Sequence, residues 1–342
     1  MKKHSSFPKI GQYRQVVKEV KLRSTYIGKD ENGNPIYDNT KEAPKIKFKG
    51  TVKLHGTNAG FAENEEDGYW VQSRSNIITP ENDNMGFARF VDDNLRAFKE
   101  LVEHVRYTNP KVKPNDTVIV FGEWAGSSIQ KGVAISQIEK SFFIFDVKIV
   151  PEDGSEAYHL ESYYLKNAEA KIYNIEDFLS YEIEIDFNRP DLSQNELTEI
   201  TNEVEKLCPV GKSFGVEGIG EGVVWSANVD GNRYIFKVKG EAHAGKSKVK
   251  TLKPVDVEKM NLIHKIAHKV TPIWRLNQFF NLSTKNGEDI DRKYIGNFIR
   301  AVIKDIKDEE SDVIEESGVK EKELNPLISK IAKEYFFEQE NL

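Results

Sequence analysis

Strict alternation of apolar and charged residues is the feature that most constrains how this chain can fold. In the segment KIKFKGTVKL (45–54), Ile46, Phe48, Val52 and Leu54 fall on one face, while lysines occupy the other. Successive side chains of a β-strand point to opposite faces of the sheet. The segment therefore predicts a strand with one buried and one exposed face.

Short strands of this kind, separated by turn residues, recur to about Lys239. A turn at Glu65–Gly68 is predicted to join the 45–54 strand to YWVQSR (69–74) in a hairpin-like arrangement. The strongest hairpin signal is the Asp230–Gly231 pair, because two-residue hairpin turns favour Asp-Gly. These patterns favour antiparallel sheets.

Helical periodicity appears at 86–105 and 191–207, and it dominates after Pro254. Strand signals almost vanish beyond that proline, so we expect a boundary near Lys250–Val255. The predicted class is α+β, with an antiparallel-sheet domain over 1–250 followed by a small all-α domain over 255–342.

Composition narrows the setting of the chain. It has 342 residues and a formal net charge of −6, which argues against a wholly cationic surface but leaves room for a local basic groove. No long apolar run is present, so no membrane span is expected. The opening residues lack the apolar core of a secretory signal, and Cys208 is the only cysteine. We expect a cytoplasmic monomer with a buried, inert thiol.

Candidate chemistry begins with the segment Lys53-Leu54-His55-Gly56-Thr57-Asn58. Lys53 and His55 share one strand face, Gly56 permits a close turn, and polar groups follow it. A lysine amine attacks phosphorus only when deprotonated, so it needs a pocket with neighbouring cations. Taken alone, Lys53 is more simply explained as an exposed strand lysine before a turn.

Four further segments strengthen the case for a site. Glu123 ends an apolar strand between glycine-bounded residues, and FFIFD (142–146) offers aromatic rings able to stack on a purine. Glu221 opens a strand with a carboxylate suited to a divalent metal or to water bound to a phosphate. Lys237 and Lys239 lie two residues apart, so both can reach one phosphate from the same strand face. Strand-end carboxylates, core aromatics and surface lysines are the ordinary explanation of each segment alone.

Together, the motifs KLHGTN, FGEWAG, FFIFD, EGVV and KVK occur in the order found in ligases and mRNA capping enzymes. The set resembles the covalent nucleotidyltransferase superfamily, and KxHGTN resembles its RNA ligase 2 branch. The segment VFGEWAGSSIQKGV, the opening KKHSS and the SRSN around Arg74 fit the same family. The resemblance covers roughly residues 1–250, and it implies that this part is a nucleotidyltransferase domain with a groove.

The resemblance also implies roles for individual residues. Lys53 is the nucleophile that forms lysyl-AMP, and His55 acts in the later steps. For the adenosine part of ATP, the resemblance implies that the Val52 backbone reads the adenine edge, Phe145 stacks on the adenine face and Glu123 binds the ribose. For the phosphates, it implies contacts from Asn58 and Arg74, with Lys237 and Lys239 at the α-phosphate. Glu221 is implied to bind a metal ion.

The expected activity is ATP-dependent joining of RNA ends, with Mg²⁺ (or Mn²⁺) as the metal ion. The partners are 5′-phosphate and 3′-hydroxyl ends, with nicked, single-stranded and splinted substrates left open. Thr51 and His4 stand where the family often has arginine and tyrosine, so the roles of those groups do not carry over.

Two alternatives remain open at this point. A GTP-dependent capping enzyme or a DNA ligase is disfavoured because these usually carry aspartate where His55 stands. A catalytically idle RNA-binding protein with a ligase fold is disfavoured because every motif keeps its reactive residue. The helices after Pro254 either contact RNA or form a stabilising cap, and their cationic and aromatic candidates are Lys265, Lys269, Trp274, Arg275, Arg292 and Lys293.

Overall fold

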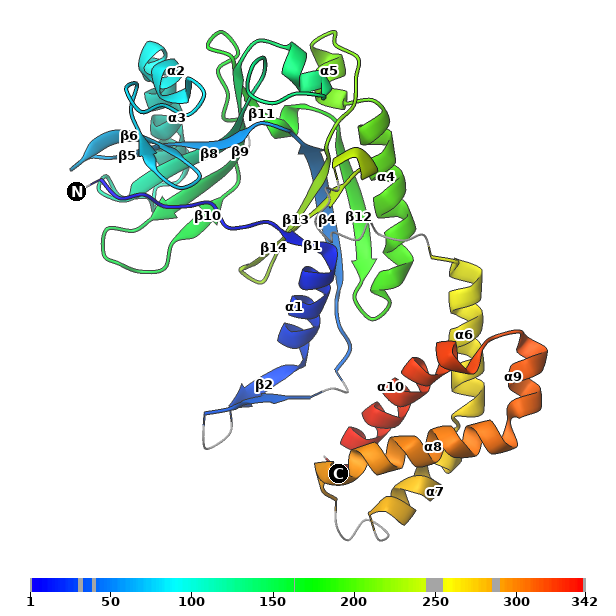
Figure 1. Cartoon of the computed structure of the whole chain (residues 1–342). Coiled ribbons are helices and arrows are strands. Elements are labelled where there is room, and N and C mark those ends of the chain that lie inside the picture. The colour runs from blue at the N-terminus through cyan, green and yellow to red at the C-terminus, as the bar shows by residue number, and fades with distance from the viewer. Residues whose placement is uncertain are drawn as a thin grey trace. The chain divides into compact units, whose positions relative to one another are not determined.

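Two β-sheets organise the strand-rich part of the chain (Figure 1). The computed structural model describes residues 2–29, 33–38, 41–162, 164–243, 255–284 and 290–340. The first sheet has the strand order β1-β14-β13-β4-β12. Its strands are β1 (Gly11–Gln12), β4 (Lys45–Lys53), β12 (Ser180–Asp186), β13 (Gly222–Val229) and β14 (Asn232–Lys239).

The second sheet has the order β10-β9-β8-β5-β6-β7, with β11 paired to β9. Its strands are β5 (Thr57–Asn64), β6 (Gly68–Ser73), β7 (Ile77–Ile78), β8 (Thr117–Ala125), β9 (Ser141–Val150), β10 (Tyr158–Leu160) and β11 (Ile172–Asn174). Most pairings in both sheets are antiparallel; β1 with β14 and β11 with β9 are parallel. The expected antiparallel α+β architecture is confirmed.

Helices α2 (Phe87–Asp93) and α3 (Leu95–Thr108) cover one face of the second sheet. Their buried residues, including Phe87, Phe98 and Leu101, share a core with Phe61 of β5. Removing apolar surface of this kind from water is the main stabilising contribution to such a contact. The α4 helix (Gln194–Lys206) and the short α5 helix (Pro209–Ser213) follow β12. Cys208, between them, is 2% exposed, as expected.

The helices after Pro254 form their own core. They are α6 (Val257–Val270), α7 (Ile273–Ser283), α8 (Ile295–Glu309), α9 (Ser311–Ser317) and α10 (Glu321–Glu340). Arg275 was expected to be able to meet RNA, and that expectation is wrong. Its side chain is buried and pairs with Asp305 at 2.8 Å and Glu310 at 2.9 Å, so it holds α7 to α8.

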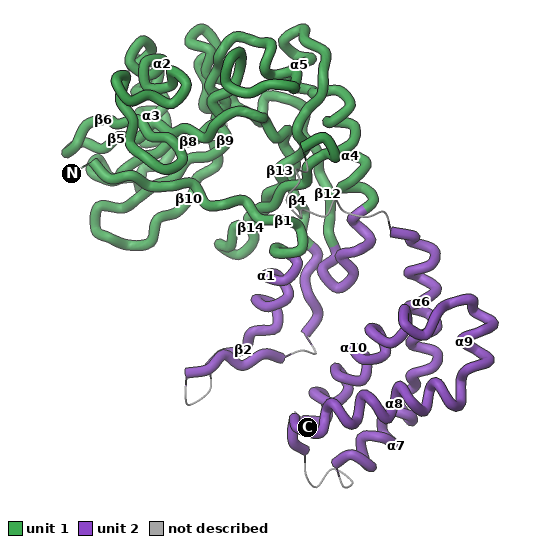
Figure 2. The backbone as a smooth tube through the Cα atoms, viewed as in Figure 1, with its two compact units in different colours: residues 1–16, 46–185, 195–253 green, residues 17–45, 186–194, 254–342 purple. Residues whose placement is uncertain are grey.

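The chain divides into two compact units, each containing more than one segment (Figure 2). Unit 1 comprises Met1–Val16, Ile46–Ile185 and Asn195–Lys253. Unit 2 comprises Val17–Lys45, Asp186–Gln194 and Pro254–Leu342, and therefore combines the C-terminal helices with earlier segments. The expected boundary at Lys250–Val255 falls, apart from Val255 itself, outside the described residues.

Several local predictions need correction. The strand paired with β6 is β5, not the 45–54 strand, because β4 ends at Lys53 and the chain starts a new strand, β5, in the other sheet at Thr57. The helical segment 86–105 is two helices that meet at Asn94. Helix α1 (Tyr13–Thr25), strand β12 and the small β2–β3 pair (Tyr26–Lys29 and Pro35–Tyr37) were not expected. None of the described helices is long and apolar enough to cross a membrane.

Candidate active site

The register of three adjacent strands places the candidate lysines on one face of the first sheet. Lys53 of β4 lies opposite Gly222 of β13, which lies opposite Lys239 of β14. Thr51 and Lys237 lie in the same way on either side of Val224, one row further along the strands. Since directly opposed residues point to the same face, all three lysines project together.

Glu221 joins the lysines at one end of this face. Its Oε2 lies 2.7 Å from Lys53 Nζ and its Oε1 lies 2.6 Å from Lys239 Nζ. The His55 Nδ1 atom is 3.3 Å from the same Oε2. Glu221 is 2% exposed, and although burial acts to raise its pKa, the ion pairs with Lys53 and Lys239 hold that pKa below its ordinary value. The carboxylate is therefore charged and shared between two ammonium groups.

Gly222 gives the site its close spacing. Its φ is +145°, and a Cβ atom at this position would stand 2.2 Å from the Val238 carbonyl oxygen. Only glycine fits without a shift of the backbone. The absence of a side chain lets β13 approach the β14 backbone closely at the row that holds Lys53 and Lys239.

The second sheet contributes Glu123 and Asn58, which lie directly opposite one another on β8 and β5. The Gly56 amide donates a 3.0 Å hydrogen bond to Glu123 Oε1, and burial raises the pKa of Glu123 to about 7 despite the nearby Lys53. Among the described residues, the buried Oδ1 of Asn58 has no hydrogen-bond partner. A polar atom of this kind is suited to a ligand.

Phe145 enters the site through a β-bulge. Phe121 pairs with Asp146 and Gly122 pairs with Ile144, so Phe145 is the extra residue on β9. Bulges turn a side chain away from the regular pleat. Phe145 is partly exposed, whereas Phe143 is fully buried and stacks on Tyr173, so Phe145 offers the accessible ring.

These groups border a pocket of about 490 Å³ within unit 1. Seven of the predicted residues line it: Val52, Lys53, Asn58, Arg74, Glu123, Phe145 and Lys237. The other three, His55, Glu221 and Lys239, adjoin it through their contacts at the Lys53 end. Val52 as a whole residue is 3% exposed, and strand alternation points its side chain to the face opposite that of Lys53.

Burial and neighbouring charges lower the pKa of two basic groups at this pocket. Burial, with Lys53 and Lys239 nearby, lowers the pKa of Lys237. Burial also lowers the pKa of His55, and the ring of His243, 5.3 Å away between centroids, acts in the same direction. A phosphate group entering here would meet Lys237, Lys239 and the exposed Arg74.

The pocket lining also includes residues that were not anticipated, among them Phe7, Lys9, Glu176 and Arg233. Phe7 packs on Phe145 with ring centroids 5.0 Å apart. The segment before β1 carries it there and has no periodic pattern that could have indicated this position. Thr51 and His4 stand where related sequences often have arginine and tyrosine. Thr51 lines the pocket, and His4 Nε2 lies 3.1 Å from the carbonyl oxygen of Ser73 in β6.

The donor set around Glu221 is compatible with a divalent ion that also binds phosphate. Mg²⁺ usually takes one or two carboxylates together with substrate phosphates and water, rather than an all-protein cage. Over the described residues no cluster of three or more His, Cys, Asp or Glu side chains could hold a metal. One buried carboxylate beside three lysines fits an ion that arrives with a nucleotide.

The fold and site define an α+β protein with a lysine-rich, carboxylate-centred pocket between β-strands. Residues 46–239, more than half of the chain, match the family described as RNA ligase. The chain belongs to the RNA ligase family.

Solved structures of RNA ligase from Naegleria gruberi are similar to this chain. The form with PPi has 15% sequence identity and a TM-score of 0.44, and the match covers 72% of this chain and 59% of that one. A mutant with AMP and Mn gives the same values, and another with ATP and Mn differs only in its 16% identity. This chain thus matches about three fifths of the length of those proteins. A search of curated proteins finds no match.

Proposed function

We propose that this protein is an ATP-dependent RNA ligase that joins 5′-phosphate and 3′-hydroxyl ends through a lysyl-AMP intermediate. The observation that carries the proposal is the placement of Lys53 Nζ 2.7 Å from the buried Glu221 carboxylate, at the end of a pocket lined by Phe145. Membership of the RNA ligase family supports it.

The first step joins Lys53 to AMP. The Nζ atom gives up a proton to water and attacks the α-phosphorus of ATP; an N–P bond forms, and the P–O bond to pyrophosphate breaks. Lys237 and Lys239 stabilise the charge that develops on the phosphate oxygens. A divalent ion at Glu221, when bound, would neutralise phosphate charge further.

Two transfers then complete the reaction. A 5′-phosphate oxygen of the RNA attacks the AMP phosphorus and breaks the N–P bond, which frees Lys53. The 3′-hydroxyl next attacks the activated 5′-phosphorus, and AMP leaves. Within this scheme Glu123 holds the ribose, Asn58 and Arg74 hold phosphate, and His55 acts after the first step. The residues that form lysyl-AMP are proposed to lie within residues 1–250, and residues 255–342 are proposed to form a separate helical domain.

Covalent labelling tests the proposal directly. Wild-type protein incubated with labelled ATP should acquire AMP, whereas Lys53→Ala should acquire none while keeping its fold. Lys45→Ala, an exposed lysine on the same strand, is the matched control and should label normally. Labelling of Lys53→Ala would rule out this nucleophile. Comparable labelling of wild type by GTP would favour the capping-enzyme alternative, and no labelling at all would favour an idle RNA-binding protein.

A further inference from the structure

The rows of side chains on the first sheet extend beyond the lysine end of the pocket. Past the Thr51–Val224–Lys237 row comes a row containing Lys49, Ser226 and Ile235. Four residues along β4 separate Lys49 from Lys53, a distance of about 13 Å at the usual rise of a strand. Lys53, Phe145 and Glu176, the ion-pair partner of Lys49, all line one pocket, so a base stacked on Phe145 while its phosphate lies at Lys53 can present an edge to Glu176.

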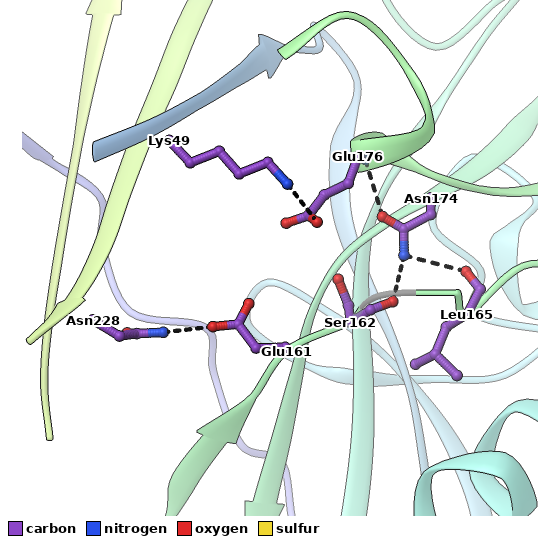
Figure 3. A network of polar contacts seen from close by, with 7 residues as sticks. All are labelled: Lys49, Glu161, Ser162, Leu165, Asn174, Glu176 and Asn228. Atoms are coloured by element: carbon purple, nitrogen blue, oxygen red, sulfur yellow. Dashed lines mark hydrogen bonds and ion pairs between the residues drawn. The ribbon is translucent and has the colours of Figure 1, made fainter. Parts of the chain in front are cut away.

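A polar network stands at that end (Figure 3). Lys49 Nζ donates a 2.8 Å hydrogen bond to Glu176 Oε2, and the Glu176 amide donates a 3.0 Å hydrogen bond to Asn174 Oδ1. Asn174 is itself 1% exposed and donates to the carbonyl oxygens of Ser162 and Leu165. The network fixes the 3₁₀ turn Ile175–Asp177, which carries Glu176.

Glu176 has one carboxylate oxygen to spare. Its side chain is 19% exposed and lines the 490 Å³ pocket beside Phe145 and Ser226. Lys49 takes Oε2, and in the part of the chain that the structure describes no hydrogen bond reaches Oε1. An accepting oxygen thus remains at the end of the pocket where the base edge would lie.

We propose that Glu176 is the specificity-determining residue for adenine, accepting a hydrogen bond from the exocyclic 6-amino group. This assignment rests on the proposed function, because it places the α-phosphate at Lys53. Adenine presents a donor at position 6, whereas guanine presents the O6 acceptor. A carboxylate accepts from the first and repels the second, so one residue both selects ATP and rejects GTP.

A second cation near this end of the pocket, Arg233, is engaged within the protein. Arg233 Nη1 lies 2.7 Å from the buried Asp146 carboxylate, and Asp146 also contacts His159 Nδ1 at 2.5 Å. Arg233 therefore serves the Asp146 pair beneath Phe7, 5.7 Å from that ring. Its Nη1 group is thus already committed to Asp146 and His159.

The test removes either the 6-amino donor of the nucleotide or the Glu176 acceptor of the protein. Self-labelling of the full chain is measured with ATP and with purine riboside triphosphate, which lacks the 6-amino group. Wild type should prefer ATP by about tenfold or more, the usual effect of a hydrogen bond to a charged group. Glu176→Ala should reduce this preference to within about twofold, because the acceptor is gone.

Glu176→Gln gives a second measurement that does not depend on the alanine variant folding. Its amide can donate to O6, so the preference for ATP over GTP should fall by about tenfold or more. Glu161→Gln is the matched control: Glu161 accepts from Asn228 at 2.8 Å and lines the adjoining 250 Å³ pocket but not the 490 Å³ pocket. It should leave both preferences unchanged.

The outcomes are distinguishable. Unchanged preferences in folded Glu176→Gln, or equal labelling of wild type by ATP and purine riboside triphosphate, would overturn the role of Glu176 while leaving lysyl-AMP formation intact. A wild-type protein labelled by none of these nucleotides would overturn the proposed function, and the assignment with it.

Discussion

Burial sets the charge of one carboxyl in the site, Glu123, and this has a measurable consequence for stability. Its pKa is raised from the ordinary value of 4.5 to about 7. Between these pH values the unfolded chain releases the proton and the folded chain keeps it. Stability from this group is therefore fully present below pH 4.5 and is lost as pH rises through about 7.

Glu123→Gln should remove that pH dependence. Relative to the variant, the wild-type free energy of unfolding should fall as pH rises from 5 to 8, by up to about 3 kcal/mol for a shift of this size. Denaturant unfolding of both proteins at several pH values measures the difference. Parallel profiles would show that Glu123 ionises normally in the folded protein.

At this scale, the sequence predicted residues that sit in local motifs and missed those brought in from elsewhere. Lys53, Glu123, Glu221 and the paired lysines each occupy a strand end or a strand face, where period-two alternation fixes direction. Glu176 arrives on a 3₁₀ turn and Phe7 on an irregular segment. Neither has a period, and their positions depend on tertiary packing alone.

Among the elements, the β13–β14 hairpin determines the geometry of the lysine end. Gly222→Ala forces a Cβ atom to within 2.2 Å of the Val238 carbonyl oxygen at a φ of +145°. We expect a loss of about 2–4 kcal/mol in stability and a loss of AMP labelling, because the strands must separate between Lys53 and Lys239.

Gly231→Asn in the turn of the same hairpin is the control. Its φ is +75°, a region that asparagine tolerates, and no atom lies within 4 Å of the added Cβ. It should cost less than about 1 kcal/mol and preserve labelling. Thermal melting and AMP labelling are measured for both variants. Equal losses in the two would mean that the close approach of Gly222 to the Val238 carbonyl oxygen is unimportant.

Strand and helix prediction succeeded where one face is apolar. The 45–54 alternation and the Asp230–Gly231 turn are confirmed, with Asp230 and Gly231 both at positive φ. Helix α1 was missed although Tyr13, Val16 and Val20 are buried at helical spacing, since its basic residues obscured the pattern. The pairing of β6 was wrong because the turn at Gly56 gave no sign that β4 and β5 belong to different sheets.

On the scale of the whole molecule, the residues of the proposed adenylylation site all precede the C-terminal helices. A fragment ending at Val255 should therefore still label itself with AMP, within about tenfold of the full chain. It should fail to seal RNA, and its RNA affinity should show a shallower salt dependence because cationic groups such as Lys265 and Arg292 are absent.

Sealing of RNA by that fragment at the rate of the intact protein would show that the helices are not a substrate-binding device. Full-length protein with Lys265→Ala and Lys269→Ala, two exposed lysines of α6, is the complementary control, because it keeps the helical core and the ion pair of Arg292 with Glu340. Loss of sealing in that variant as well would locate the effect in charge rather than in folding.

The class of the fold was predictable because strand and helix periods occupy separate stretches of sequence. The composition of the units was not. Unit 2 draws Val17–Lys45 and Asp186–Gln194 into the same body as the C-terminal helices, and no composition change marks those segments. Contacts of this range leave no local pattern, so sequence periodicity alone does not predict them.

The rows across β4, β13 and β14 also limit which mutations the gene can accumulate. Deleting a single codon between Lys47 and Lys53 would turn Lys53 toward the core and leave Val52 facing the pocket, since side-chain direction alternates with every residue. Deleting two codons would restore direction but shift each group by one row. Substitutions on this strand can therefore be tolerated one position at a time, whereas a change in its length alters the placement of Lys49, Thr51 and Lys53 relative to β13 at once.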